Sequence, residues 1–315
     1  MSTGTSGSVS SSTDLTSVRA IATKDFQDAV RSWLFWGLSL LFFFLLALIT
    51  GAISYFGEDI TAEGVTTEAL VVIVSQVTSA VIPLIALVLG WKAIAGERES
   101  GTIKIMLSLP HSRKDVILGK LIGRSAVLSL SLVVGFVLAA VIVAIGLGGF
   151  DVVDYVGLLA VSVVYGVAYT SIAVAISALA RSTTVAAASA FGVFILFYVV
   201  WNALLIIFSL LSSREVLFFE FVAYTGEIND QEFQGQRLQS WMYLVHDLDP
   251  GNAYANVLSL ATSAADIEGA NVVQAEMFGG SVPFYLQDWF ALVILAFWIV
   301  VPLGVALYRF DRGDL

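Results

Sequence analysis

Residues 155–180 read YVGLLAVSVVYGVAYTSIAVAISALA and contain no aspartate, glutamate, lysine, arginine or histidine. A helix of about 20 apolar residues crosses the hydrocarbon core of a bilayer, which is about 30 Å thick. Backbone groups in lipid must bond within their own segment, so a helix is the expected structure. Comparable uncharged stretches occur at 32–57, 69–91, 125–150, 182–213 and 289–308. The sequence therefore predicts an all-α polytopic membrane protein, in which residues 34–315 form a six-helix domain with spans over about 34–56, 69–91, 121–149, 155–180, 183–211 and 289–308.

The composition of the whole chain agrees with this prediction. Of its 315 residues 58% are hydrophobic and 13% charged, and the mean hydropathy is +0.90. Soluble domains are about half apolar and a quarter charged, which disfavours a soluble enzyme or a soluble domain with buried helices. The net charge of -10 argues against a nucleic-acid partner. Cysteine is absent and only His111 and His246 are present, so we expect no metal or cofactor in this chain.

The lysines and arginines predict the orientation in the membrane. Cytoplasmic loops carry an excess of these residues. With the six spans in place, thirteen of the fifteen basic residues lie on one side, and Arg214 and Arg237 lie on the other. We therefore expect a multi-pass protein of the plasma membrane with both termini in the cytoplasm.

The acidic residues are concentrated on the opposite, outer side. The outer loops together carry a charge of -15 and the inner segments a charge of +5. A dense carboxylate surface stays hydrated in concentrated salt while its self-repulsion is screened. A high-salt habitat, as for a halophilic archaeon, is the hypothesis that follows.

The N-terminal residues divide into two parts. Residues 1–13 are almost entirely Ser, Thr and Gly and predict a disordered tail, and no cleavable signal peptide is expected. Residues 14–33 place apolar side chains at helical spacing and charged ones on the opposite face. They predict an amphipathic helix in the cytoplasmic interface that leads into the first span. The alternative is a simple cytoplasmic extension of that span.

Residues 212–288 form the long outer loop, in which Asp249-Pro250-Gly251 is a turn sequence. The residues around this turn are too apolar for a solvated loop, so we expect short helices resting on the outer membrane surface. The loop would be either a substrate gate or a structural cap. His246, with Asp247 and Asp249 beside it, could form a metal site, although a histidine with two exposed acids is more commonly solvated surface.

Small and polar residues at the spans predict helix packing. Gly119 and Gly123 form a GxxxG pair, compatible with a subunit interface or with packing inside the chain. Six polar residues interrupt the uncharged spans and either bond helices together or line a site for an amphipathic cargo: Gln76, Thr78, Ser162, Tyr165, Tyr169 and Asn202.

The loop between the second and third spans carries the clearest functional pattern. Residues 92–124 read KAIAGERESGTIKIMLSLPHSRKDVILGKLIGR. Gly101 ends one helix, residues 102–109 form a short apolar element that Pro110 terminates, and Ser112 with Asp115 is a capping-box pattern that begins the next helix. Two helices joined by a compact segment over 92–120 suit the transmission of force from a soluble partner. A merely positive connector is the alternative.

The residues Glu97-Arg98-Glu99-x-Gly101-Thr102, Leu107-Ser108-x-Pro110, Ser112-Arg113 and Gly119-Lys120 resemble the cytoplasmic loop of type-2 ABC exporter permeases. The likeness is greatest to the branch that includes the permease of nitrous oxide reductase maturation. It implies a permease that dimerises and docks an ATP-binding subunit. We expect a homodimer, because closed twofold assemblies are the commonest, and a pair of two different permeases is the alternative. The resemblance also implies that 102–109 is the coupling helix, that 14–33 is the connecting helix, and that nine residues take part in coupling: Glu97, Arg98, Glu99, Gly101, Thr102, Lys104, Pro110, Ser112 and Arg113.

The motifs that are missing narrow the function. No GxxxxGKS or GxxxxGKT phosphate-binding loop occurs, so ATP and Mg²⁺ are expected on the partner subunit and the chain is not expected to be an enzyme itself. The sequence thus predicts the membrane-spanning subunit of an ATP-driven exporter, in contact with membrane lipid. An ion-coupled carrier or channel is disfavoured because the spans hold no charged residue. A membrane assembly factor that recruits an ATPase is a further alternative. With no cysteine and four methionines, copper-site maturation is not carried over.

Overall fold

The computed structural model describes residues 14–31, 33–60, 67–102, 112–146, 151–228, 231–263 and 270–312. Within these ranges six segments are long and apolar enough to cross a membrane, which confirms the predicted polytopic all-α class. They lie in α2 (Trp33–Ile60), α3 (Thr67–Gly90), α6 (Arg113–Gly146), α7 (Val152–Leu179), α8 (Thr183–Ile195) continued by the π-helical segment η1 (Leu196–Trp201), and α13 (Asp288–Arg312).

The fifth span differs from the continuous helix predicted over 183–211. After η1 the chain turns and resumes as α9 (Leu204–Ser213). The Asn202 side chain donates to the carbonyl oxygens of Phe197 and Tyr198, at 3.2 and 3.0 Å. A side chain that inserts into the backbone hydrogen bonds of a helix is a recognised cause of a kink.

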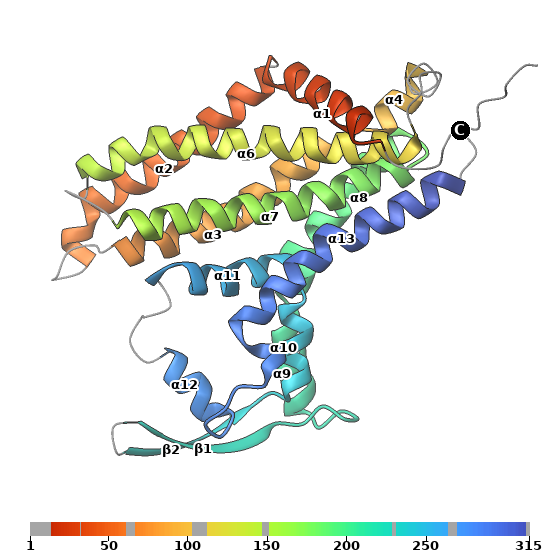
Figure 1. Cartoon of the computed structure of the whole chain (residues 1–315). Helices are drawn as coiled ribbons and strands as arrows, with labels where there is room; N and C mark the ends of the chain where they lie inside the picture. The colour runs from red at the N-terminus through yellow and green to blue at the C-terminus, as the bar shows by residue number, and fades with distance from the viewer. Residues whose placement is uncertain are drawn as a thin grey trace, which may run out of the picture.

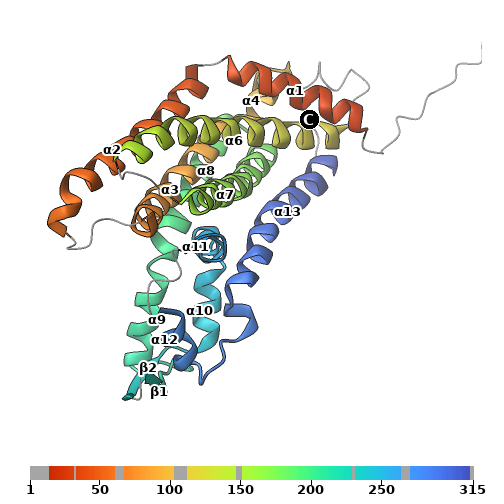
Figure 2. The same ribbon diagram turned by 60° about the vertical axis from the view of Figure 1, so that its left-hand side comes forward.

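Helix α7 occupies the centre of the bundle. It contacts α3, α6 and α13, and α6 in turn contacts α2 and α1 (Leu15–Val30). Figures 1 and 2 show α2, α3, α6 and α7 running side by side, with α1 lying against α6. Small residues permit this packing: a Cβ on Gly166 of α7 would lie 2.7 Å from Leu128 Cδ2 of α6.

Helix α1 corresponds to the predicted amphipathic helix. It begins at Asp14, whose carboxylate accepts the backbone N–H of Thr16 at 3.1 Å. Its buried face includes Val18 and Ile21, which lie towards α6. The predicted tail over residues 1–13 lies outside the described residues.

The outer segment contains a β-hairpin that the sequence analysis missed. Strand β1 (Val222–Ile228) pairs antiparallel with β2 (Gln231–Arg237), in a register that runs from Val222 opposite Arg237 to Ile228 opposite Gln231. Figure 1 places this hairpin at the end of the molecule farthest from α1. Asn229-Asp230 is a turn sequence between two short stretches of strand-forming residues, and this pattern could have revealed the hairpin.

Two short helices follow the hairpin. They are α10 (Ser240–Asp247), which packs on α9, and α11 (Pro250–Ala261), which alone of the two enters the bundle. The later helix α12 (Ala270–Met277) packs on β1. The sequence analysis placed such helices at the outer surface. Instead, α11 lies along α7 and α13, and Figure 1 shows it parallel to the long helices. Two tryptophans hold the link that leads into α11: Trp298 of α13 donates to Leu248 O at 2.8 Å, and Trp201 donates to His246 O at 3.0 Å.

Candidate functional site

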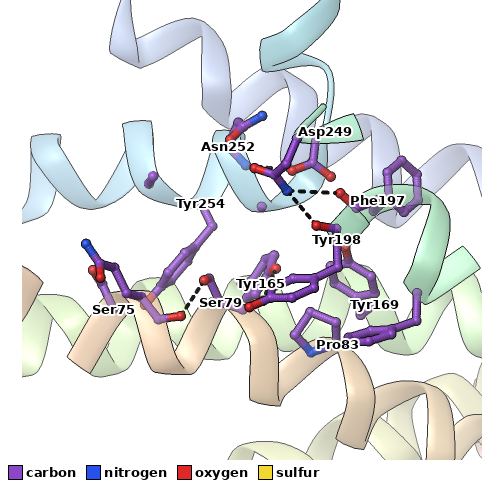
Figure 3. Close-up of a pocket in the computed structure, with 15 residues that line it drawn as sticks. Ser75, Ser79, Pro83, Tyr165, Tyr169, Phe197, Tyr198, Asp249, Asn252 and Tyr254 are labelled. Atoms are coloured by element: carbon purple, nitrogen blue, oxygen red, sulfur yellow. Dashed lines mark hydrogen bonds between the residues drawn. The ribbon is translucent and has the colours of Figure 1, made fainter. Parts of the chain in front are cut away.

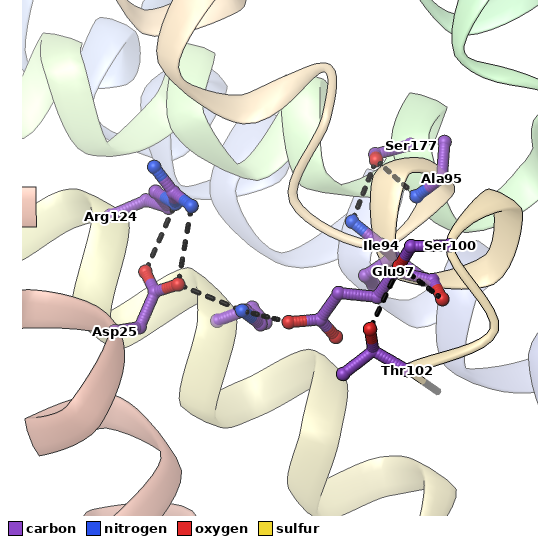
Figure 4. A network of polar contacts seen from close by, with 9 residues as sticks. Asp25, Ile94, Ala95, Glu97, Ser100, Thr102, Arg124 and Ser177 are labelled. Carbon is purple, nitrogen blue, oxygen red and sulfur yellow. Dashed lines mark hydrogen bonds and ion pairs between the residues drawn. The ribbon is translucent and has the colours of Figure 1, made fainter. Parts of the chain in front are cut away.

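The short helix α4 (Ala95–Glu99) follows α3 directly and is fixed to α7. Its first N–H groups, those of Ile94 and Ala95, donate to the Ser177 hydroxyl at 2.9 and 3.0 Å (Figure 4). The first turn of a helix leaves such donors without partners in its own backbone. A side chain of α7 therefore determines where α4 begins.

Asp25, Glu97, Lys120 and Arg124 form a group of charges, here called the hinge cluster, in which Asp25 and Lys120 are buried and Glu97 and Arg124 half-buried. Lys120 Nζ lies 2.8 Å from Asp25 Oδ1 and 2.5 Å from Glu97 Oε1. Arg124 Nε lies 3.0 Å from Asp25 Oδ2. The Asp25 side chain is 4% exposed and the Lys120 side chain 9%. Figure 4 shows Asp25 on α1 and Glu97 on α4 at opposite ends of the cluster.

The hinge cluster ties three elements together through charge. Two carboxylates face two cations, so the group is neutral as a whole. Burial of an ion is costly unless a partner compensates it, and removal of one partner leaves the other uncompensated. A displacement of α4 or α1 relative to α6 would separate these charges. The cluster therefore favours movement of the three elements as one body.

Arg98 and Glu99 extend the attachment of α4 to two more spans. Arg98 donates to Ala180 O at 2.5 Å, at the end of α7, and its guanidinium lies 5.5 Å from the Phe310 ring of α13. The Glu99 carboxylate accepts the backbone N–H and the hydroxyl of Thr183, at 3.1 and 2.5 Å, at the start of α8. Three consecutive side chains of α4 thus reach α6, α7 with α13, and α8.

Gly101 turns the chain out of α4 into the loop. Its φ of +75° lies in the left-handed region, which favours glycine. Nothing lies within 4 Å of a Cβ built there, so the backbone conformation alone selects glycine. The hydroxyls of Ser100 and Thr102 lie 2.8 Å apart across this turn. Residues 103–111, and with them Lys104, Pro110 and most of the predicted coupling helix 102–109, lie outside the described residues.

The loop returns to the bundle at the predicted capping box. Asp115 N donates to Ser112 Oγ at 3.1 Å and Ser112 N donates to Asp115 Oδ2 at 2.8 Å. The other Asp115 oxygen accepts the Asp14 backbone N–H at 3.1 Å, which joins the start of α6 to the start of α1. Arg113 donates to Phe310 O of α13 at 2.9 Å.

The GxxxG pair seats α1 on α6. A Cβ on Gly119 would lie 2.7 Å from Ile21 Cβ, and one on Gly123 would lie 2.9 Å from Asp25 Cβ. The two glycines therefore serve packing inside the chain, one of the two possibilities that the sequence left open. They also bring Asp25 close enough to reach Lys120.

Seven of the nine predicted coupling residues lie in the described part of the chain, at the two ends of the loop. The sequence analysis missed three residues that fix the elements around them: Asp25 and Arg124 in the hinge cluster, and Ser177 at the start of α4. One pattern could have pointed to the hinge cluster: Lys120 and Arg124 lie four residues apart on one helix face, where two like charges need a shared acidic partner.

A cavity of about 450 Å³, here called the central cavity, lies between α3, α7, α11 and the fifth span (Figure 3). Ser79 of α3 and Tyr165 of α7 lie near the middle of their helices, and Tyr165 donates its hydroxyl to Ser79 O at 2.9 Å. The cavity therefore lies at the mid-height of these helices, and it opens to the outside of the chain where Gln76, Tyr198 and Asn202 are exposed. Its lining comprises Ser75, Gln76, Ser79, Pro83, Tyr165, Tyr169, Phe194, Phe197, Tyr198, Asn202, Asp249, Gly251, Asn252, Tyr254 and Ala255.

Asp249 brings a carboxylate to this cavity from the outer loop. It is 3% exposed and caps α11, since its Oδ2 accepts the Asn252 backbone N–H at 3.0 Å. Its Oδ1 is buried and has no hydrogen-bond partner among the described residues. Burial raises the pKa of Asp249 from 3.8 to about 6, against the hydrogen bonds that lower it.

The polar residues that interrupt the predicted spans have different positions. Four of the six line the central cavity: Gln76, Tyr165, Tyr169 and Asn202. Ser162 instead bonds the Tyr254 hydroxyl at 3.1 Å, and Thr78 is buried between α2 and α3. His246 Nδ1 lies 3.4 Å from Asp247 Oδ1, and the described residues contain no group of three such side chains placed to bind a metal. Asp249, expected at the solvated surface, is instead buried, where it caps α11 and lines the central cavity.

Comparison with known proteins gives two results. The family model described as ABC-2 family transporter protein matches residues 19–315. The chain is 31% identical over 207 residues to the probable ABC transporter permease protein NosY of Pseudomonas aeruginosa, covering 62% of this chain and 72% of that protein. It is 29% identical over 199 residues to the probable NosY permease of Stutzerimonas stutzeri, covering 61% of this chain and 71% of that protein.

Proposed function

This chain belongs to the ABC-2 family of transporter proteins, and we propose that, as the membrane subunit of an ABC transporter, it works as an exporter driven by a separate ATP-binding subunit. That partner would dock on the loop over 92–120. The sequence has no phosphate-binding loop of its own, so ATP and Mg²⁺ would be bound by the partner.

The hinge cluster is the observation that carries this proposal. The two ends of the loop, α4 and the start of α6, are joined by the Glu97–Lys120 ion pair, and Asp25 adds α1. Arg98 and Arg113 extend the connection to α7 and α13. A push on the loop would therefore move several spans together. A simple connector needs no such cross-linking.

The rest of the assembly is proposed from general considerations. We propose two copies of the chain in the transporter, because closed twofold assemblies are the commonest. The positive-inside distribution supports a plasma-membrane protein with both termini in the cytoplasm. Exposed apolar side chains on the spans, such as Phe44, Phe191 and Val300, would contact lipid or the second copy.

Co-purification with matched variants tests the proposal. The tagged chain is isolated in mild detergent from its host, and the eluate is examined by mass spectrometry and for ATP hydrolysis. Gly101→Ala strains the turn at the loop and should lower the amount of ATP-binding subunit and the ATPase activity. Gly279→Ala is the control, because Gly279 also has a positive φ of +72° and open space, but lies in the outer segment.

Arginine variants give a second comparison. Arg113→Ala removes the contact with α13 and should reduce coupling, while Arg237→Ala, which removes a cation from above the Phe278 ring in the outer segment, should not. Isolation of the chain with no ATP-binding subunit, and with no ATPase activity at any salt concentration that keeps it folded, would contradict the proposal.

One observation favours the second candidate, an ion-coupled carrier. The spans themselves carry no charge in their middle, but the outer loop brings Asp249 into the bundle. Acidic residues at such depth often bind or relay ions. ATP hydrolysis by the purified complex separates the two candidates.

A further inference from the structure

We propose that the central cavity binds a small organic ammonium ion, held by the Asp249 carboxylate and by the tyrosine rings that surround it. The identity of this ion as transported cargo, or as the head group of a larger amphipathic cargo, rests on the proposed function. The binding site itself stands on the geometry of the cavity.

Among the described residues the Asp249 carboxylate forms no ion pair, although His246 is near enough to interact with its charge. The Asp249 Oδ1 atom has no hydrogen-bond partner in this part of the chain, although the residue is 3% exposed. A buried carboxylate without a partner is costly, and a bound cation would offset that cost.

The packing of α11 keeps the carboxylate in this position. A Cβ on Gly251 would lie 2.7 Å from Asp249 Oδ2 and 3.5 Å from the Tyr165 hydroxyl, so a side chain there would displace the carboxylate. At the far end of α11, the Asp154 carboxylate accepts the Ser263 backbone N–H at 2.9 Å. Both ends of α11 are therefore fixed against α7.

The rings around Asp249 suit an organic cation. Tyr165 stacks on Tyr254 with ring centroids 4.6 Å apart, and Tyr169 meets Tyr165 edge-on at 5.1 Å. Aromatic faces attract ammonium groups, and aromatic cages recognise quaternary ammonium ligands. Tyr198, stacked on Phe194 at the edge of the cavity, is 48% exposed and would leave a route from the side.

The volume of the central cavity and the side chains that line it disfavour a bare metal ion as the bound ligand. A volume of about 450 Å³ falls within the range of small-molecule sites, about 300–1,000 Å³. Calcium takes six to eight oxygen ligands. Asp249 is the one carboxylate that lines this cavity in the described part of the chain. The amides of Gln76, Asn202 and Asn252 could bond a hydroxyl carried by the ammonium compound.

Choline and its uncharged carbon isostere, dimethylbutanol, are the probes that test the proposal. Binding to the purified full chain in detergent is followed by saturation-transfer NMR, which detects weak ligands, at constant chloride concentration. We expect choline to bind and dimethylbutanol to bind at least tenfold more weakly. Equal binding of the two compounds, no binding of choline, or full competition by potassium chloride at equal concentration would overturn the proposal.

Asp249→Asn tests the carboxylate, because asparagine can still cap α11 while it removes the charge. We expect a loss of choline affinity of at least tenfold. Asp247→Asn changes a neighbouring acid whose side chain is 21% exposed, and should leave binding unchanged. Should Asp249→Asn fail to fold, Tyr169→Leu replaces one ring and should weaken binding several-fold. Unchanged affinity in the folded variants would refute the assignment.

The result of the choline-binding experiment does not depend on the proposed function. The binding experiment uses the chain without nucleotide or partner. Choline binding in the absence of any ATPase partner would leave the site intact and make it the site of a carrier. An active ATPase complex without choline binding would remove the site and leave the proposed function standing.

Discussion

Replacement of glycine by alanine should have opposite effects at two positions in the spans. Gly119 of α6 faces α1, and an added Cβ would lie 2.7 Å from both Cβ and Cγ2 of Ile21 and 3.1 Å from Val18 O. Gly192 of α8 is also helical, but nothing lies within 4 Å of its added Cβ. The same chemical change thus meets a packed interface in one case and open space in the other.

The expected changes in the free energy of unfolding follow from two opposing effects. Alanine is favoured over glycine inside a helix by about 1 kcal/mol. Extra volume in a packed site costs about 1–3 kcal/mol. The contacts at Gly119 involve Cβ and a backbone oxygen of α1, which cannot rotate away, so the cost should lie in the upper part of that range. Gly119→Ala should therefore destabilise the protein by about 1–2 kcal/mol, and Gly192→Ala should stabilise it by up to about 1 kcal/mol.

Thermal unfolding in mild detergent, followed by tryptophan fluorescence, compares the two variants with the parent. A cysteine at position 22 adds a local readout, because Ala22 is 7% exposed and the natural chain has no cysteine. Maleimide should label this cysteine faster in the Gly119→Ala background, since α1 is pushed away from α6. Equal stability and equal labelling in both backgrounds would refute the described seating of α1.

Three further predictions concern the charged contacts. Lys120→Met leaves Glu97 without its ion pair and should lower the free energy of unfolding by about 2 kcal/mol. The loss should be smaller than for a fully buried pair, because Glu97 is 21% exposed. If the effects of Lys120→Met and Glu97→Gln simply add in a double-mutant cycle, the two residues do not interact. Because the pKa of Asp249 is raised in the folded protein, the protonated acid stabilises the fold. We therefore expect the free energy of unfolding to be highest below about pH 4 and to decline as the pH rises to about 6. The difference between 3.8 and about 6 corresponds to about 3 kcal/mol, which Asp249→Asn should abolish; parallel stability curves from pH 4 to pH 8 would disprove this. Asp154→Ala removes the bonds to the Ser263 backbone and hydroxyl and should cost about 1–2 kcal/mol, visible as faster hydrogen exchange at Ser263 and unchanged exchange in α1.

The cytoplasmic loop shows which features of this protein local sequence patterns can predict and which they cannot. The sequence located the ends of the cytoplasmic loop, because Gly101 and the Ser112–Asp115 capping pair are short-range features. It did not predict that Glu97 pairs with Lys120, or that Lys120 pairs with Asp25 far away along the chain. No spacing rule connects residues on three different helices, since their meeting depends on how α1 and α4 pack on α6.

The sequence by itself determined the six spans. Each depends on the length and apolarity of one continuous segment, and in lipid the backbone of that segment must satisfy its own hydrogen bonds. Only the tertiary structure decided that α11 enters the bundle and carries Asp249 to the tyrosines of α7. The apolar residues of α11 could equally have faced a membrane surface, because burial against lipid and burial against protein require the same amphipathic pattern. The choice depends on specific partners, such as Trp298 for Leu248 O and Asp154 for Ser263, which lie far away in the sequence.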